Sequence, residues 1–206
     1  MCNRYGMRDS QDQLRKHFKL KSDRTGNLAS LSNIYPDQMA PVIGLDVNGQ
    51  RGMTMMRWGY PTFPGEYATN IRNTEGKFWS SRLAKPERRC LVPWTRFCEW
   101  TDKRNAEGRK DAYWFTPKDK EPVAFAGAWI KWTGTRGPKK EQVTGEHLLF
   151  AFLTTEANSD VRPIHAKAMP VILREDDWEI WLTASLERAL RLQRPAPNGF
   201  LQKMRE

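Results

Sequence analysis

The sequence predicts an α+β fold: a single domain, mainly an antiparallel sheet or open barrel, with a few peripheral helices. Strand-like runs outnumber helical segments and follow one another as hairpins do, with Gly-, Lys- and Arg-rich loops between them. The length of 206 residues suits one domain with one core, and nine Trp and nine Phe provide an aromatic-rich interior. We therefore expect one domain over residues 1–206, in which 195–206 form a loosely ordered tail.

The first predicted elements are a helix and a hairpin. Residues 10–18 form a short amphipathic pattern that is typical of a helix, and Ser10 is a suitable N-cap. Strand-like runs at 42–47 and 53–58 are separated by Asn48-Gly49, a dipeptide that strongly favours a hairpin turn.

The rest of the chain continues as strands and ends in helices. Residues 78–83 predict a helical turn, and 134–145 predict a polar loop. Further strands are predicted at 89–92, 96–100, 112–115, 123–132, 147–154 and 171–173. Helices are predicted at 175–182 and 185–192.

The charge balance favours a nucleic-acid partner. Lys and Arg number 34 against 24 Asp and Glu, which gives a net charge of +10. A basic protein gains affinity for a phosphate backbone because each neutralised phosphate releases counterions. Aromatic side chains beside basic ones shift this expectation toward single-stranded nucleic acid, whose bases stack on rings. The alternative is that the charge serves solubility alone.

The cysteines and the hydropathy pattern predict a protein of the cytoplasm, associated with the nucleoid when it is bound to DNA. Cys2, Cys90 and Cys98 form no CxxC pair, and with three scattered histidines they make no zinc pattern. No stretch resembles a signal peptide or a transmembrane span. We expect no metal or organic cofactor, and a monomer.

Cys2 is the residue with the most unusual chemistry. If Met1 is removed, Cys2 carries both a thiol and a free α-amine, whose ordinary pKa is about 8. An amine condenses with an aldehyde to a Schiff base, and a thiol is a strong nucleophile once ionised. Together they can close a five-membered thiazolidine ring on an aldehyde carbon. The alternative is that Cys2 is simply a small residue near the start of the chain.

Several short segments give this cysteine a context. The principal segments are 1–5 (MCNRY), 69–72 (TNIR), 90–100 (CLVPWTRFCEW), 154–158 (TTEAN) and 164–170 (IHAKAMP). Supporting segments are 58–59 (WG) and 125–129 (FAGAW). In their order and spacing these segments resemble the SOS response-associated peptidase (SRAP) family, also called abasic-site processing proteins, over roughly residues 1–182.

The resemblance implies a function in the DNA damage response. Members of the family shed Met1, for which autoproteolysis is one route, and recognise abasic sites in single-stranded DNA. They trap the sugar aldehyde as a thiazolidine, a covalent protein–DNA crosslink that shields the lesion from strand breakage. The family name implies peptidase, that is hydrolase, activity, and a lyase-type activity on the DNA is a further implication.

The resemblance also assigns site residues by motif match. Cys2 is the nucleophile, Asn70 a hydrogen-bonding residue, Glu99 the acid/base carboxylate, and His165 the histidine that aids ring opening and proton transfer. The residues expected to contact DNA are Arg4, Arg72 and Lys167, with Arg82, Arg88 and Arg89 as weaker backbone candidates.

The residue types suit these roles, although each has an ordinary alternative. An abasic sugar is mostly a closed hemiacetal, so a proton must move to or from the ring oxygen before the aldehyde appears. A carboxyl in apolar surroundings has a raised pKa and can move that proton, and Glu99 lies between Cys98 and Trp100. Strand alternation instead places Glu99 on a solvent face. His165 could be structural, and Asn70 a turn former.

Two other functions use the same features. An amide hydrolase with an N-terminal cysteine would attack glutamine-like amides, although such chains usually begin Met-Cys-Gly and here Asn3 follows Cys2. A non-catalytic module for single-stranded DNA would need the charge and the aromatic residues alone, and its binding would not depend on an abasic site.

Overall fold

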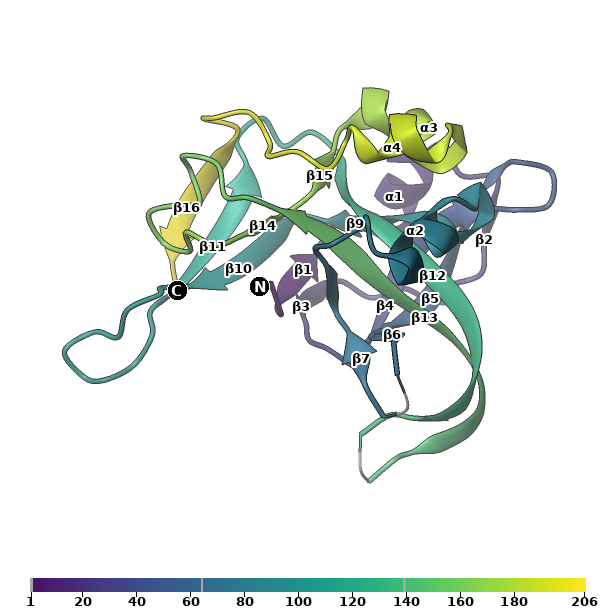
Figure 1. Ribbon diagram of the computed structural model, residues 1–206, viewed down its shortest axis with the longest axis horizontal. Helices are drawn as coiled ribbons and strands as arrows, with labels where there is room; N and C mark the ends of the chain where they lie inside the picture. The colour runs from purple at the N-terminus through teal and green to yellow at the C-terminus, as the bar shows by residue number, and fades with distance from the viewer. Residues whose placement is uncertain (1, 64, 139) are drawn as a thin grey trace.

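A long antiparallel ribbon organises the fold (Figure 1). The computed structural model describes residues 2–63, 65–138 and 140–206. The ribbon consists of β12 (Val123–Arg136) and β13 (Val143–Thr155), which pair from Gly127↔Phe152 to Arg136↔Val143. β12 also pairs with β9 (Arg89–Trp94), from Val123↔Trp94 to Ala128↔Arg89.

Within the described residues, the ribbon belongs to a nine-stranded sheet. Its main path is β14-β13-β12-β9-β4-β5-β2, and the parallel pairing of β13 with β5 bends it round into a barrel-like form. Two short strands, β15 and β8, attach to β12 and β13. The bounds are β2 (Ser22–Asp23), β4 (Met39–Leu45), β5 (Arg51–Trp58), β8 (Asn70–Ile71), β9 (Arg89–Trp94), β14 (Met169–Pro170) and β15 (Ile172–Leu173).

A second sheet has five strands in the described residues, in the order β16-β11-β10-β1-β3. All its pairings are antiparallel. The bounds are β1 (Tyr5–Met7), β3 (Leu31–Ile34), β10 (Arg96–Trp100), β11 (Ala112–Pro117) and β16 (Leu201–Arg205), and a small separate pair is formed by β6 (Tyr60–Pro61) and β7 (Tyr67–Ala68). The predicted α+β class with a mainly antiparallel sheet is therefore confirmed.

Short helices cover the ends of the sheets. Ser10 is the N-cap of α1 (Gln11–His17), as the sequence predicts, and it forms a capping box with Gln13. The helix α3 (Glu175–Thr183) lies beside α4 (Leu186–Leu190) at one end of the molecule (Figure 1). The others are α2 (Lys77–Leu83) and the 3-10 turn η1 (Pro86–Arg88). None of the described helices is long and apolar enough to cross a membrane.

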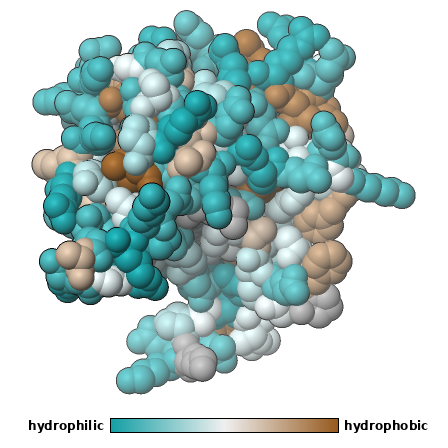
Figure 2. Space-filling model, turned by 60° about the vertical axis from the view of Figure 1, so that its left-hand side comes forward, coloured by the Kyte–Doolittle hydropathy of each residue, from teal (hydrophilic) through white to brown (hydrophobic). Residues whose placement is uncertain are grey.

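An aromatic cluster joins the two sheets. Tyr5 of the five-stranded sheet meets Trp58 edge to face at 5.2 Å between ring centroids, and Phe125 packs on Phe152 at 4.6 Å. Trp94 stacks on Phe125 at 4.9 Å. These rings are buried, and their packing fixes how the strand that follows Cys2 meets the barrel. The exterior is largely hydrophilic on the face shown in Figure 2, where apolar areas are small and separate.

The C-terminal segment differs from the prediction of a loosely ordered tail over 195–206. Residues Leu201–Arg205 form β16 and pair with β11 from Tyr113↔Arg205 to Pro117↔Leu201. Asp160 accepts hydrogen bonds from the backbone N–H groups of Gly199 and Leu201, and the Asn158 amide donates to the carbonyl of Ala196. The tail is therefore part of the sheet, and it holds the loop that contains residues 157–165.

Arg89 corrects another prediction. Its side chain is fully buried at the start of β9, where the guanidinium donates hydrogen bonds to the carbonyls of Trp181 and Ala184 at the end of α3. A cation is favourable at a helix C-terminus, whose last carbonyls lack partners. The expectation that Arg89 contacts DNA is wrong because its charge lies inside the protein.

We predict that Arg89→Met lowers the free energy of unfolding by about 2–4 kcal/mol, because it leaves two carbonyls at the end of α3 without their charged donor. Urea unfolding followed by Trp fluorescence measures this change. Arg88→Met is the control, since Arg88 is only half-buried, and it should cost less than about 1 kcal/mol. Equal unfolding midpoints for the two variants would contradict the structural role.

Candidate functional site

Cys2 is buried three residues before the start of β1, and two hydrogen bonds hold it. The amide of Asn70 donates to the backbone carbonyl of Cys2 at 2.7 Å. The Cys2 thiol donates to the carbonyl of Arg4 at 3.6 Å. Its side chain is fully shielded from solvent, so burial raises the pKa of the thiol well above its ordinary value, and the nearby Glu99 charge raises it further. Met1, whose removal the resemblance implies, lies outside the described residues.

Asn70 reaches Cys2 from the other sheet. It begins β8, which runs parallel to β13 in the register Asn70↔Phe152. Its amide also donates to the hydroxyl of Thr69 at 2.9 Å. The parallel pairing fixes the strand, and the two donated bonds fix the side chain, so Asn70 holds the cysteine backbone in a defined position.

Glu99 is a buried carboxyl on β10. Its side chain and backbone together are 2% exposed, so the alternative of a solvent-facing strand residue is wrong. Strand alternation fails here because β10 is covered on both faces: Cys98, its neighbour, is also buried. Burial raises the pKa of Glu99 from 4.5 to about 8, and the negative charge of Asp102 contributes to the rise. At neutral pH the carboxyl therefore carries its proton.

His165 lies at the end of the loop that the C-terminal segment supports. Its backbone N–H donates to Val161 at 3.0 Å, and its Nδ1 lies 3.0 Å from Oδ1 of Asp102. The ring is half-buried. Burial lowers the pKa of His165 below its ordinary value, although Asp102 acts in the opposite direction. The imidazole is therefore mainly neutral at pH 7 and can accept a proton.

The structure thus brings the four predicted catalytic residues into one chain of interactions. Asn70 bonds Cys2, and Glu99 lies close enough that its ionisation raises the pKa of the Cys2 thiol. Asp102 in turn raises the pKa of Glu99, and its carboxylate bonds His165. Asp102 was missed by sequence reasoning. It stands in a polar loop after β10 and looks like an ordinary turn residue, so nothing local signals its partner.

Three buried polar atoms in this region have no hydrogen-bond partner among the described residues. They are the hydroxyl of Tyr5, Oδ1 of Asn70 and Oε1 of Glu99. A buried polar group without a hydrogen-bond partner lowers the stability of a protein by about 1–3 kcal/mol. Such groups are therefore typical of sites where a ligand or water supplies the missing hydrogen bond. Tyr5 is a second residue to which the sequence assigned no role, although it ends the 1–5 segment.

The residues predicted to contact DNA differ in their surroundings. Arg72 and Lys167 are exposed, close in the chain to Asn70 and His165 respectively. Arg82 is half-buried over the ring of Phe78, and Arg88 lies 5.4 Å from the ring of Trp129. Arg82 also borders a pocket of about 330 Å³ whose other lining residues are Pro61, Thr62, Phe63, Gly65, Tyr67, Ile130 and Trp132.

Arg4 is already engaged within the protein. Its guanidinium forms a two-point ion pair with Glu206, at 2.7 and 2.8 Å, and its Nε donates to Asn33. It also lies 4.7 Å from the ring of Trp114, and its side chain is only 13% exposed. A phosphate could reach this guanidinium only by displacing the Glu206 carboxylate.

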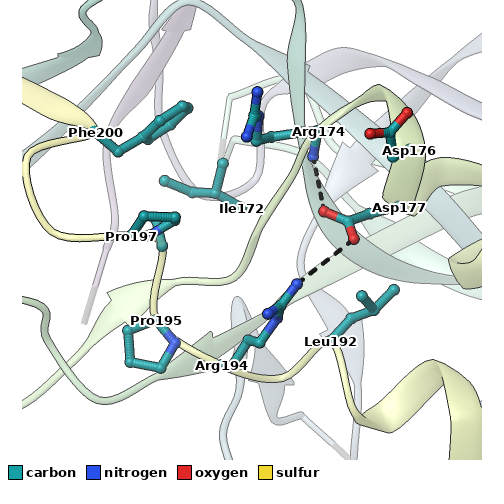
Figure 3. Close-up of a pocket in the computed structure, with 10 residues that line it drawn as sticks. Ile172, Arg174, Asp176, Asp177, Leu192, Arg194, Pro195, Pro197 and Phe200 are labelled. Atoms are coloured by element: carbon teal, nitrogen blue, oxygen red, sulfur yellow. Dashed lines mark hydrogen bonds and ion pairs between the residues drawn. The ribbon is translucent and has the colours of Figure 1, made fainter.

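The pocket in Figure 3 is a different feature from the cysteine site. It has a volume of about 250 Å³ and lies between the start of α3 and segment 192–200. Asp177 there accepts a hydrogen bond from the backbone of Arg174 and lies 3.9 Å from Arg194 (Figure 3). None of the predicted site residues lines this pocket. The lining residues are Ile172, Arg174, Asp176, Asp177, Leu192, Arg194, Pro195, Ala196, Pro197 and Phe200.

The fold and the site together define a class of protein, an α+β domain that encloses a cysteine near its N-terminus beside a protonated carboxyl. The model of the family "SOS response associated peptidase (SRAP)" matches residues 1–205, and the chain belongs to this family. The resemblance noted from the sequence motifs is therefore confirmed at the level of the family. The comparison with curated proteins gave no match.

Solved structures show the same fold. A protein from Bordetella bronchiseptica is 21% identical, with 100% of this chain and 99% of that chain covered and a TM-score of 0.78. One from Bacteroides thetaiotaomicron is 21% identical, with 99% and 91% covered and a TM-score of 0.78. A phage-related protein from Bordetella bronchiseptica is 20% identical, with 100% and 94% covered and a TM-score of 0.71. At these identities the likeness concerns the fold.

We predict that Glu99→Gln becomes progressively more stable than wild type as the pH rises from about 5 to about 8. The unfolded chain loses the Glu99 proton near 4.5 and the folded protein near 8. Between these values the unfolded state binds fewer protons, so the stability of wild type falls with pH, by at most about 1.4 kcal/mol per pH unit. The glutamine side chain does not ionise, so the stability of Glu99→Gln does not fall for this reason.

Urea unfolding at several pH values measures this difference. Glu146→Gln is the matched control, because Glu146 is 56% exposed and pairs only with Lys131 among the described ion pairs. Its difference from wild type should not change with pH over this range. A Glu99→Gln difference that is equally flat would mean that Glu99 is ionised in the folded protein.

Proposed function

We propose that this protein processes abasic sites in single-stranded DNA by forming a thiazolidine crosslink through Cys2 after Met1 has been removed. The observation that supports this proposal best is the placement of Glu99, a buried carboxyl that keeps its proton at neutral pH, within electrostatic range of the Cys2 thiol. A peptide-bond hydrolysis that exposes the Cys2 amine agrees with the peptidase in the family name.

The first chemical task is to open the abasic sugar. Its C1′ is masked as a hemiacetal, and opening moves the C1′ hydroxyl proton to a base while the ring oxygen receives a proton. Glu99 can donate the proton because its raised pKa keeps it protonated at pH 7. His165 can accept the other, since its lowered pKa keeps the ring neutral. The products are the free aldehyde and a 4′ hydroxyl.

The second task is to join the aldehyde to Cys2. The α-amine adds to the aldehyde carbon, and loss of one water molecule gives an iminium. Protonation of the departing hydroxyl by an acid such as Glu99 assists this loss. The thiol then adds to the iminium carbon and gives up its proton, which closes the five-membered ring. The net change is aldehyde plus aminothiol to thiazolidine plus water.

The high pKa of the thiol fits this sequence of steps. A neutral thiol is a poor nucleophile toward an amide, and thiol-dependent amide hydrolases lower the pKa of the cysteine instead. The raised pKa of Cys2 therefore disfavours the amide hydrolase alternative. An iminium formed on the same residue is a stronger electrophile, and the ring closure is intramolecular, so a thiol with little thiolate is adequate.

The charge distribution supports a DNA partner. The net charge is +10, and the exposed side chains of Arg72 and Lys167 flank the strands and loops that carry Asn70 and His165. Phosphates on either side of an abasic sugar need cations at such positions. In this proposal Arg72 and Lys167 hold the DNA strand through its phosphates. The polar atoms of Tyr5, Asn70 and Glu99 that lack a partner then form hydrogen bonds with the abasic sugar.

We predict that purified wild-type protein forms a heat-stable band of reduced mobility with a single-stranded oligonucleotide that carries one abasic site, and that Cys2→Ala forms none. The band is followed on a denaturing gel, and mass spectrometry of the free protein reports whether Met1 has been lost. Cys98→Ala is the matched control, since Cys98 is equally buried but has no part in the proposed chemistry; it should crosslink like wild type.

Two results would overturn the proposal. One is an undiminished band with Cys2→Ala. The other is no band with protein that has lost Met1, which would leave binding of single-stranded DNA without chemistry as the function.

We predict that Arg72→Ala and Lys167→Ala each reduce the salt dependence of binding to single-stranded DNA. Each lost phosphate contact should lower the slope of log K against log salt concentration by about 0.7. Fluorescence anisotropy of a labelled strand over a salt series measures the slope. Arg15→Ala is the control, because Arg15 is an exposed arginine of α1 whose guanidinium is paired with Asp12 and Asp23. An unchanged slope for Arg72→Ala and Lys167→Ala would remove them from the DNA contact surface.

A further inference from the structure

Asp102 contacts the imidazole of His165 directly. Its Oδ1 lies 3.0 Å from Nδ1 of His165, and its Oδ2 accepts the backbone N–H of Ala166 at 3.0 Å. The carboxylate is therefore held at both oxygens by two consecutive residues of one loop. Its own backbone N–H donates to Ile164 at 3.2 Å, which ties the end of β10 to the same loop.

These contacts determine which ring nitrogen carries the proton. The backbone N–H of Ala166, and then the charge of His165, lower the pKa of Asp102, so the carboxyl is ionised at neutral pH. An ionised carboxylate only accepts hydrogen bonds. The nitrogen that faces it, Nδ1, must therefore carry the hydrogen, and in the neutral ring the lone pair is on Nε2.

We propose that Asp102 is a positioning residue that fixes His165 in the tautomer with hydrogen on Nδ1 and thereby makes Nε2 the proton acceptor of the cysteine site. The inference rests on the proposed function and deepens it, since it names the atom that accepts the sugar proton. Asp102 touches neither the cysteine nor the substrate; it acts through the imidazole, as second carboxylates do beside other catalytic or metal-binding histidines.

The charges around the imidazole agree with this role. Asp102 raises the pKa of His165, whereas burial of the ring and the positive charge of Lys110 lower it. Lys167 faces Asp102 and helps to keep it ionised. Asp102 also raises the pKa of Glu99. One carboxylate therefore influences both the base and the acid of the proposed reaction.

Asp102→Asn changes the hydrogen-bond pattern with little change in shape. The Ala166 N–H still requires an oxygen, so the amide group turns its NH₂ toward Nδ1 of His165. An NH₂ donates hydrogen bonds, which forces Nδ1 to accept and moves the ring hydrogen to Nε2. The variant should therefore hold the imidazole in place but in the wrong tautomer.

The first measurement is the ring-nitrogen NMR spectrum of the whole protein. There are three histidines, and His165→Gln identifies the signals of His165. In wild type at neutral pH we expect hydrogen on Nδ1, and in Asp102→Asn hydrogen on Nε2. Hydrogen on Nε2 in wild type would overturn the inference by itself, whether or not any variant folds and whether or not the protein crosslinks DNA.

The second measurement is the rate of crosslinking to abasic single-stranded DNA as a function of pH. Wild type should show a bell-shaped profile, limited by His165 on the acid side and by Glu99 near 8 on the alkaline side. Asp102→Asn should react about 100-fold more slowly at its optimum. Both limbs should move to lower pH, because the charge that raises both pKa values is gone.

The control is Asp111→Asn, the same substitution in the same loop, where the carboxylate bonds Asn105 and Arg205 instead; it should keep the wild-type profile. Asp102→Asn could instead crosslink more slowly while the limbs of its pH profile and the His165 tautomer stay as in wild type. That result would mean that Asp102 only supports the loop, and the inference would fail. No crosslinking by wild type would overturn the proposed function, while the NMR result would still decide the tautomer.

Discussion

The pairing of β1 with β10 is the constraint on which the site depends. Tyr5 lies opposite Phe97, and Gly6 lies opposite Arg96. β1 is also paired on its other edge with β3, and a side chain on Gly6 would come within 2.5 Å of the carbonyl of Ser32. Glycine at this position lets three strands meet closely. The short strand is thereby fixed on both edges, and Cys2 is delivered to the end of β10 that carries Glu99.

The same arrangement explains how a carboxyl stays neutral inside the protein. Glu99 belongs to the five-stranded sheet, whereas Asn70 belongs to the barrel-like one, and the aromatic cluster packs the two sheets together beside them. Glu99 is buried at this junction, so ionisation of its carboxyl would cost more than retention of its proton. The site exists at the seam between two sheets because neither alone could bury the carboxyl and also present an amide to the cysteine backbone.

Local features of the fold could be predicted from the sequence, whereas long-range partners could not. The turn at Asn48-Gly49 has the positive φ of 72° at its glycine that the dipeptide favours. The burial of Arg89 was not predictable, because a buried arginine has the same sequence appearance as an exposed one until its carbonyl partners, 92 and 95 residues away, are known. Asp102 was missed for the same reason, since its histidine is 63 residues away.

The long sequence separations within the site have a consequence for newly made protein. Asn70 reaches back 68 residues to Cys2, and Asn158 reaches forward 38 residues to the C-terminal segment that steadies the histidine loop. Contacts of such separation form late, because the chain must close large loops before they stabilise it. Until then the cysteine lies in an open chain without its shield of strands. Aldehydes and oxidants in the surroundings therefore have their best access to the Cys2 thiol before folding is complete, since the folded protein buries it fully.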